Sequence, residues 1–284
     1  MSTWVWVDGN LSTAEDARVA ALDHGLTVGD GVFETCKVVD GSPFALTRHL
    51  ARLRRSADII GLRLPWSDDD LRAACGDTIG AARIDAANAT AGIERLRITI
   101  TGGPGPLGSD RSDVPPTLVI AAGPGSPWPA ATSVVTVPWT RNERSAVAGA
   151  KTTSYAENVV ALAEAHRHGA SEAVLANTRG ILSEGTGSNV FLELDGVLCT
   201  PSLATGCLAG ITRALVCALV DVVERDDLTF EDLHRTSEAF LTSSTRDVHP
   251  IEAIDGRPLT VPGPLTAAAA DAFAALQAHT LDPA

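Results

Sequence analysis

Apolar and polar positions recur along the chain in patterns that predict both strands and helices. Apolar residues at 46, 50, 53, 57 and 60 have helical spacing, and Gly61 follows where a helix-ending glycine is expected. Residues 68–83 predict a second helix, with three aspartates in its first turn. Residues 3–9 and 32–46 predict strands that turn at Asp-Gly pairs.

The remainder of the chain mixes strands and helices in the same way. Strands are expected at 95–103, 117–123, 132–139 and 239–244, hairpins at 172–185 and 189–200, and helices at 156–169, 209–224 and 263–280. A segment rich in proline and glycine, residues 122–131, predicts a linker. The expected fold class is therefore α/β (α+β), with an N-terminal subdomain over 1–121 and a C-terminal subdomain over 132–284.

Composition and charge narrow the classes of partner. The chain has 284 residues and a formal net charge of −13, which disfavours binding to nucleic acid. No apolar run is long enough to predict a membrane span. The five cysteines form no CxxC pair, so neither a disulfide framework nor a zinc or other metal site is expected. This cysteine usage favours a reducing, cytoplasmic environment.

One lysine, Lys151 in AGAKTTSYAENVV, lies just before a predicted helix, with small and hydroxyl residues around it. A solvated lysine at a helix start is the common interpretation of such a position. A lysine that forms a Schiff base is the alternative, because that chemistry needs an uncrowded amine.

Three other segments have the composition of ligand-binding turns. ILSEGTGSNVF places Glu184 before a turn rich in glycine and hydroxyls, CLAGITRALV begins an apolar helix, and FLTSSTRDV follows a strand with two serines. A helix N-terminus and exposed backbone N–H groups can bind phosphate. Each segment can equally be an ordinary hairpin, helix cap or loop.

Taken together and in this order, the segments resemble the fold-type IV pyridoxal-phosphate enzymes. The resemblance runs from DHGLTVGDGVFET through HLARLRRSA, AKTTSYAENV, SEGTGSNVF and LAGITRA to FLTSSTRDVHPI, nearly the whole chain. This family includes branched-chain aminotransferases, D-amino-acid aminotransferases and 4-amino-4-deoxychorismate lyases. It implies a smaller N-terminal α/β subdomain, a larger β-barrel-like C-terminal subdomain and pyridoxal 5'-phosphate as cofactor.

The resemblance assigns roles to individual residues. Lys151 corresponds to the lysine that binds the cofactor and moves the proton, and Glu184 to the carboxylate at the pyridine nitrogen. Arg52 corresponds to the phosphate-binding arginine, whereas His49 in the same helix is expected to pack or to face solvent. Tyr155 corresponds to a tyrosine near the phenolic oxygen, although its spacing from the lysine is one residue shorter than in many relatives.

Other positions complete the implied cofactor site. Leu208 corresponds to a residue that packs on the cofactor ring, and Asn189 is expected to support the turn after the glutamate. The remaining implied cofactor contacts, which surround the phosphate, are Gly210, Ile211, Thr212, Ser243 and Ser244.

The predicted strand GVFETCKVV carries the residues expected to choose the substrate. Phe33, Thr35 and Lys37 share one face because the side-chain period of a strand is two. Thr35 resembles the threonine proposed to assist proton transfer in the lyases, and Lys37 resembles the D-amino-acid enzymes. Gly102 and Gly103 stand where D-amino-acid enzymes carry a carboxylate-binding arginine, so they are expected to line the substrate pocket.

The reaction itself stays open between two enzymes with a common first proton abstraction. The main hypothesis is a lyase that converts 4-amino-4-deoxychorismate to 4-aminobenzoate and pyruvate in folate biosynthesis. The alternative is a class IV aminotransferase with a branched-chain, D-amino-acid or amine donor, using the same Lys151 and Glu184. Arg111 and Arg141 are both candidates for binding the substrate carboxylate. The resemblance also implies a homodimer with shared active sites, in which a loop of one subunit closes the site of the other; segments 23–31 and 103–113 are the candidates for that loop.

Overall fold

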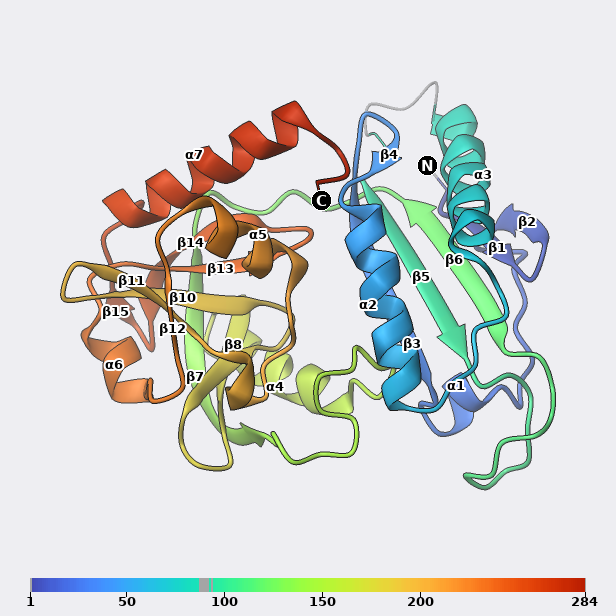
Figure 1. Ribbon diagram of the computed structural model, residues 1–284, viewed down its shortest axis with the longest axis horizontal. Coiled ribbons are helices and arrows are strands. Elements are labelled where there is room, and N and C mark those ends of the chain that lie inside the picture. The colour runs from blue at the N-terminus through green and yellow to red at the C-terminus, as the bar shows by residue number, and fades with distance from the viewer. Residues whose placement is uncertain (1, 87–91, 93, 284) are drawn as a thin grey trace. The chain divides into compact units, whose positions relative to one another are not determined.

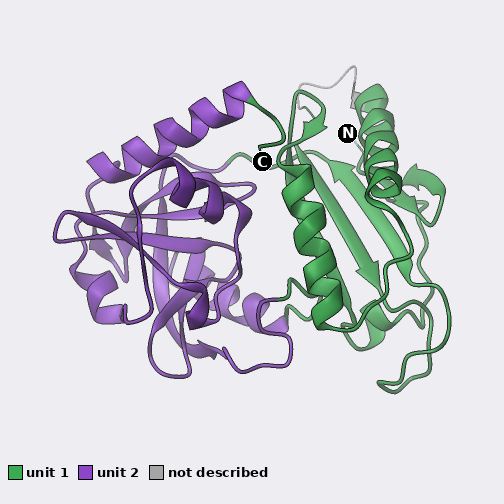
Figure 2. Cartoon of the chain, viewed as in Figure 1, with its two compact units in different colours: residues 1–127, 150–155, 280–284 green, residues 128–149, 156–279 purple. Residues whose placement is uncertain are grey.

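The computed structural model describes residues 2–86, 92 and 94–283, which form two compact units (Figure 2). Unit 1 consists of residues 1–127, 150–155 and 280–284, and unit 2 of residues 128–149 and 156–279. Each unit has its own sheet and its own helices. This α/β architecture confirms the fold class expected from the sequence.

Unit 1 is built on a six-stranded antiparallel sheet of order β2-β1-β6-β5-β3-β4 (Figure 1). The strands are β1 (Trp4–Val7), β2 (Asn10–Thr13), β3 (Gly31–Val39), β4 (Ser42–Pro43), β5 (Arg95–Thr101) and β6 (Thr117–Gly123). The expected hairpin at residues 32–46 is confirmed: β3 pairs with β4 across a turn in which Asp40 and Gly41 both have positive φ. This hairpin fixes which residues of β3 face each side of the sheet.

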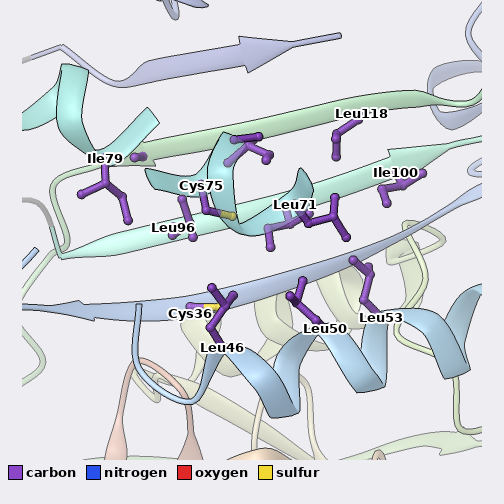
Figure 3. Close-up of a cluster of buried hydrophobic side chains, with 14 of the residues drawn as sticks. Cys36, Leu46, Leu50, Leu53, Leu71, Cys75, Ile79, Leu96, Ile100 and Leu118 are labelled. Carbon is purple, nitrogen blue, oxygen red and sulfur yellow. The ribbon is translucent and has the colours of Figure 1, made fainter. Parts of the chain in front are cut away.

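Three helices complete unit 1, α1 (His24–Thr27), α2 (Leu46–Ile59) and α3 (Asp68–Ala86). The apolar side chains of α2 and α3 pack on one face of the sheet, where Leu50, Leu53 and Leu71 are fully buried (Figure 3). Gly61 follows α2 with φ +65°, which confirms the predicted helix end. Since α2 covers β3, residues on the inner face of β3 meet side chains of α2.

Unit 2 is built on a nine-stranded mixed sheet in the order β12-β11-β10-β13-β14-β7-β8-β9, with β15 paired to β14. The strands are β7 (Thr132–Arg141), β8 (Glu172–Asn177), β9 (Leu182–Gly185), β10 (Asn189–Leu194), β11 (Val197–Pro201), β12 (Val223–Arg225), β13 (Ala239–Ser243), β14 (Asp247–Ile254) and β15 (Arg257–Pro258). Both expected hairpins, β8–β9 and β10–β11, are confirmed.

The helices of unit 2 are α4 (Ala156–Arg167), η1 (Leu203–Thr205), α5 (Ile211–Leu219), α6 (Phe230–Arg235) and α7 (Pro264–His279). The expected long helix over 209–224 is wrong at its C-terminal end. Val220 is extended, and Val223–Arg225 forms β12, which pairs in parallel with β11. The β-branched valines suit an edge strand, and sheet pairing outweighs the helical pattern there.

A short segment, residues 150–155, returns to unit 1 and lies along β3. Phe33 N donates to Lys151 O over 3.0 Å, Thr153 N donates to Gly31 O over 2.9 Å, and Val32 forms an isolated bridge with Thr152. These bonds attach the lysine to the edge of β3 next to Phe33. In the part of the chain that the structure describes, no helix is long and apolar enough to cross a membrane.

Candidate active site

Lys151 is fixed through its backbone on both sides. Its N–H donates to Ser56 Oγ of α2 over 3.0 Å, and its carbonyl accepts from Phe33 N of β3. The side chain is half-buried. These two hydrogen bonds fix the backbone of the predicted catalytic lysine, and neither of them uses its side-chain amine.

Two aromatic rings surround the amine. Lys151 Nζ lies 4.3 Å from the centroid of the Phe33 ring and 3.4 Å from Tyr155 Oη. The two rings meet edge to face with centroids 5.2 Å apart. The structure thus brings together three of the predicted site residues, and the shorter spacing to Tyr155 does not keep its hydroxyl from the lysine.

The open face of the unit 1 sheet is basic beside this aromatic pair. Arg97 of β5 is the cross-strand partner of Thr35, and its guanidinium carbon lies 3.7 Å from the Phe33 ring centroid. Arg95 is the partner of Lys37 on the same face. Arg97 was missed by the sequence reasoning, although basic residues at alternate positions of a predicted strand are the signal that could have found it.

Arg52 is buried on the opposite face of the sheet, where β3 meets α2. Its Nε and Nη2 donate to Glu34 Oε1 and Oε2 over 2.8 and 2.7 Å. His49 Nδ1 lies 2.7 Å from the same Oε2. The expectation that His49 packs or faces solvent is incomplete, because His49 is buried and hydrogen-bonded to a carboxylate that the sequence pattern did not single out.

The ionisation of Glu34 is set by these two neighbours. Burial raises the pKa of this carboxyl, but Arg52 and His49 lower it further, to about 2. Burial lowers the pKa of His49, so this histidine stays neutral near pH 7 and donates from Nδ1 as the matching tautomer. The group as a whole is a buried arginine–glutamate ion pair with a neutral histidine donor.

We expect this ion pair to make unit 1 sensitive to acid. The Glu34 pKa is 4.5 unfolded and about 2 folded, so its stabilisation is present above pH 4.5 and is lost as the pH falls towards 2. The full difference corresponds to on the order of 3 kcal/mol in free energy of unfolding. Urea unfolding of wild type and Glu34→Gln at pH 6 and pH 3.5 measures it. The wild type should lose more stability than the variant, and equal losses would contradict the prediction.

In unit 2, Glu184 ends the β8–β9 hairpin as a buried side chain. Its Oε2 accepts from the backbone N–H of Leu208 over 2.8 Å, and its Oε1 lies 2.9 Å from Arg141 Nε. Arg141 Nη2 also donates to Asn158 over 2.9 Å. A carboxylate that accepts from a backbone N–H and pairs with a guanidinium has a fixed orientation, which suits a partner for a ring N–H.

The turn after Glu184 is fixed by a second buried carboxylate. Glu172 accepts from Thr186 N and Ser188 Oγ, each over 3.0 Å. Asn189 Nδ2 donates to Leu208 O over 2.9 Å. Asn189 therefore links the Glu184 turn to the Leu208 loop, and its role at a cofactor stays a prediction.

The start of α5 suits a bound anion. Its N-cap is Gly210, which has no side chain to bond the first N–H groups, and Ile211 and Thr212 follow as buried residues. A Cβ at Gly210 would overlap Asn189 Oδ1. An uncapped helix start with a threonine hydroxyl fits the phosphate of the expected cofactor. Ser243 ends β13, against which α5 packs, and Ser244 follows it in the turn to β14.

The remaining predicted positions lie elsewhere in unit 1 or have other partners. Gly102 N donates to Asp30 O, and Gly103 O accepts from His24 N, so both glycines hold the segment around α1. Their contact with substrate stays a prediction. Arg111 makes a two-point contact with Asp30, at 2.7 and 2.6 Å, and Arg141 binds Asn158 and Glu184. Both arginines carry structural contacts, whereas Arg97 contacts the same Phe33 ring as the lysine does.

Comparison with known proteins identifies what the chain is similar to. The sequence profile described as amino-transferase class IV matches residues 31–254. A protein of Methanocaldococcus jannaschii, provisionally named a branched-chain-amino-acid aminotransferase, is 33% identical over 262 residues, which is 89% of this chain and 88% of that protein. The branched-chain aminotransferase of Thermoproteus uzoniensis with norvaline has a TM-score of 0.84 and 31% identity, covering 96% of this chain and 94% of that one.

A lyase relative is more distant. The structure of a candidate 4-amino-4-deoxychorismate lyase from Legionella pneumophila has a TM-score of 0.82 and 24% identity, covering 94% of this chain and 97% of that one. Identity at that level shows a shared fold only. The comparisons therefore favour the aminotransferase alternative over the lyase that the sequence placed first.

Proposed function

Since the chain belongs to the class IV aminotransferase family, whose members use pyridoxal 5'-phosphate, we propose that it is a branched-chain amino acid aminotransferase with a dicarboxylic 2-oxo acid as acceptor. The observation that carries this proposal is the surroundings of Lys151. Phe33 and Tyr155 offer an apolar wall for an aliphatic side chain, and Arg97 offers a guanidinium for a carboxylate.

The chain's residues have separable tasks in this proposal. Bound pyridoxal phosphate supplies an electron sink for a carbanion next to nitrogen. Lys151 holds the cofactor and moves the substrate proton at Nζ, with Tyr155 Oη at 3.4 Å to orient the amine. Glu184 keeps the ring nitrogen protonated, and Leu208 packs on the ring. The phosphate ligands in this proposal are Arg52, Gly210, Ile211, Thr212, Ser243 and Ser244.

Thr35 and Lys37 belong to substrate selection in this proposal. Both lie on the open face of β3, with Arg97 and Arg95 as their respective cross-strand partners. A substrate with a second carboxylate fits a face with three cations better than an amine without a carboxylate does. Thr35 is also the residue that a lyase would use for proton transfer, so the assay described next includes the lyase substrate.

A substrate survey tests the proposed activity. Purified holoenzyme is given L-valine, L-leucine, L-isoleucine, D-alanine or an aromatic amine with 2-oxoglutarate, and separately 4-amino-4-deoxychorismate. We expect the three branched-chain amino acids to give the highest kcat/KM. A preference for D-alanine or the amine would overturn the substrate assignment, and 4-aminobenzoate as the main product would restore the lyase.

Arg97→Gln is expected to raise the KM for 2-oxoglutarate about 10- to 100-fold, since hydrogen bonds to charged groups contribute about 1.5–3 kcal/mol. The half-reaction with L-leucine, which carries no second carboxylate, should change by less. Arg63→Gln is the matched control because Arg63 is an exposed arginine outside the β5 face. Equal effects of Arg97→Gln on leucine and on 2-oxoglutarate would contradict the assigned role.

We also propose that the protein is a homodimer in which segments 23–31 and 103–113 of one subunit close the active site of the other. In the structure, Leu26 and Leu107 of these segments are 73% and 80% exposed. The two segments contact each other, since His24 Nε2 lies 3.1 Å from Pro106 O, and exposed apolar patches are typical of interaction surfaces. Light scattering should give twice the chain mass of 29.4 kDa, and a monomeric mass would contradict the dimer.

A further inference from the structure

The helix α2 carries a buried polar stripe beside its apolar one. His49, Arg52 and Ser56 recur at spacings of three and four residues, and all three are buried. We call these three residues the α2 polar stripe. Buried polar side chains destabilise a fold unless each finds a partner, so the stripe needs polar groups on the strand that α2 covers.

Glu34 is the partner that β3 provides. It lies in the inward-facing row with Val32 and Cys36, where the alternation would otherwise place an apolar residue, and it is fully buried. Its two carboxylate oxygens bind Arg52 through Nε and Nη2, and His49 binds one of them. Two of the three guanidinium nitrogens of Arg52 are therefore directed by Glu34.

This contact fixes the plane of the guanidinium. A two-point bond along the Nε–Nη2 edge allows one orientation, whereas a free arginine has about 2 kcal/mol of rotamer entropy to lose. The same contact places a negative charge against Arg52, which by itself would weaken attraction to an anion. Orientation and charge therefore act in opposite directions on any phosphate that Arg52 binds.

The polar stripe also joins Arg52 to the lysine segment. Ser56, four residues after Arg52, accepts from Lys151 N, and Phe33, next to Glu34, donates to Lys151 O. The same helix and strand thus determine where the lysine backbone and the arginine lie in unit 1. A ligand that binds both Lys151 and Arg52 therefore meets two groups whose positions are set by the same two elements.

We propose that Glu34 is a positioning residue that orients Arg52 for the phosphate of the cofactor. The proposal rests on the proposed role of Arg52 as a phosphate ligand, and it states that the gain from orientation exceeds the loss from the neighbouring negative charge. Glu34 acts through Arg52 and lies on the inner side of β3, away from the face that carries Phe33 and Thr35.

A comparison of pyridoxal phosphate with pyridoxal isolates this role. Pyridoxal lacks the phosphate but keeps the aldehyde and ring, so the ratio of its Kd to that of pyridoxal phosphate reports only recognition of the phosphate. Both constants are measured by absorbance titration of the full chain after removal of cofactor. Glu34→Gln keeps the side-chain shape but cannot accept both arginine hydrogen bonds.

For Glu34→Gln we expect the ratio to fall about 10- to 100-fold, as for other partners that orient a ligand-binding side chain. The Kd of pyridoxal should stay within about twofold of wild type, because pyridoxal has no phosphate for Arg52 to bind. Glu34→Asp keeps the charge, should give an intermediate ratio, and replaces the glutamine variant if that one does not fold. Glu15→Gln, an exposed glutamate of unit 1, is the matched control.

Each other outcome has a defined meaning. Equal weakening of both ligands means that Glu34 only supports the fold, and a higher ratio means that its charge outweighs its orienting effect; either result overturns the proposal. Arg52→Ala separates this from the proposed function. If it leaves the ratio at the wild-type value, Arg52 is not a phosphate ligand, whereas a low ratio in Arg52→Ala with a normal one in Glu34→Gln refutes the role of Glu34 alone.

Discussion

Lys151→Ala is expected to lower the rate of transamination by at least about 10⁴-fold, because in the proposed function one amine both holds the cofactor and moves the proton. In the structure this amine lies 4.3 Å from the centroid of the Phe33 ring and 3.4 Å from the Tyr155 hydroxyl. A phenyl ring has no atom that accepts a proton, and a phenol is a weak base, so we expect neither group to replace the amine.

The scarcity of lysine allows a decisive labelling experiment. The chain has two lysines, Lys37 and Lys151. Borohydride reduction of the holoenzyme followed by peptide mass spectrometry should place the cofactor on residue 151 alone, and Lys37→Met should be labelled as the wild type is. Recovery of the label on Lys37, or a Lys151→Ala variant with more than about one per cent of the activity, would refute the assignment.

Most elements of the fold follow from local patterns. The apolar spacing of α2 and the glycine after it, or the Asp-Gly turn between β3 and β4, are properties of short segments, and the structure has them where they were expected. The end of α5 was not predictable in this way. Residues 220–225 continue a helical apolar pattern, and only the pairing of β12 with β11, distant in the sequence, decides that they form a strand.

The residues of the candidate site also fall into those that local sequence predicts and those that it does not. Lys151 and Glu184 lie in motifs that can be recognised from neighbouring residues. The roles of Arg97 and Glu34 depend on partners in other elements, which the local sequence does not show. Glu34 stands in a strand where alternation predicts an apolar residue, and the arginine that neutralises it comes from α2. A polar residue that breaks a binary pattern is a usable signal, but the pattern does not identify its partner.

The choice between lyase and aminotransferase was beyond the sequence motifs for a chemical reason. Both reactions begin with proton abstraction by the same lysine, so the cofactor-binding residues are common to both. Thr35 alone pointed to the lyase. The similarity to branched-chain aminotransferases supports the aminotransferase, whereas Arg97, across from Thr35, could bind a carboxylate of either substrate.

Glu184→Gln is expected to lower kcat about 10²- to 10³-fold, the range observed when one preorganised charge-stabilising group is removed from an active site. The carboxylate accepts from Leu208 N and contacts Arg141, so glutamine fits its place but brings an NH₂ group towards one of these two donors. Without a negative charge there, the cofactor's ring nitrogen loses the partner that keeps it protonated, and its capacity to withdraw electrons falls.

The same variant separates electronic from covalent roles. In the proposed function Glu184 tunes the electronics of the ring and Lys151 forms the covalent bond. Glu184→Gln should therefore still be labelled on residue 151 by borohydride while turning over slowly. Glu184→Asp, which keeps the charge on a shorter side chain, should recover part of kcat.

Glu193→Gln removes a carboxylate of unit 2 that accepts from Gly196 N and Ser237 Oγ, and it should leave kcat within about threefold of wild type. Normal turnover in Glu184→Gln would mean that another group protonates the ring, and loss of labelling would mean that the glutamate is needed to bind the cofactor at all.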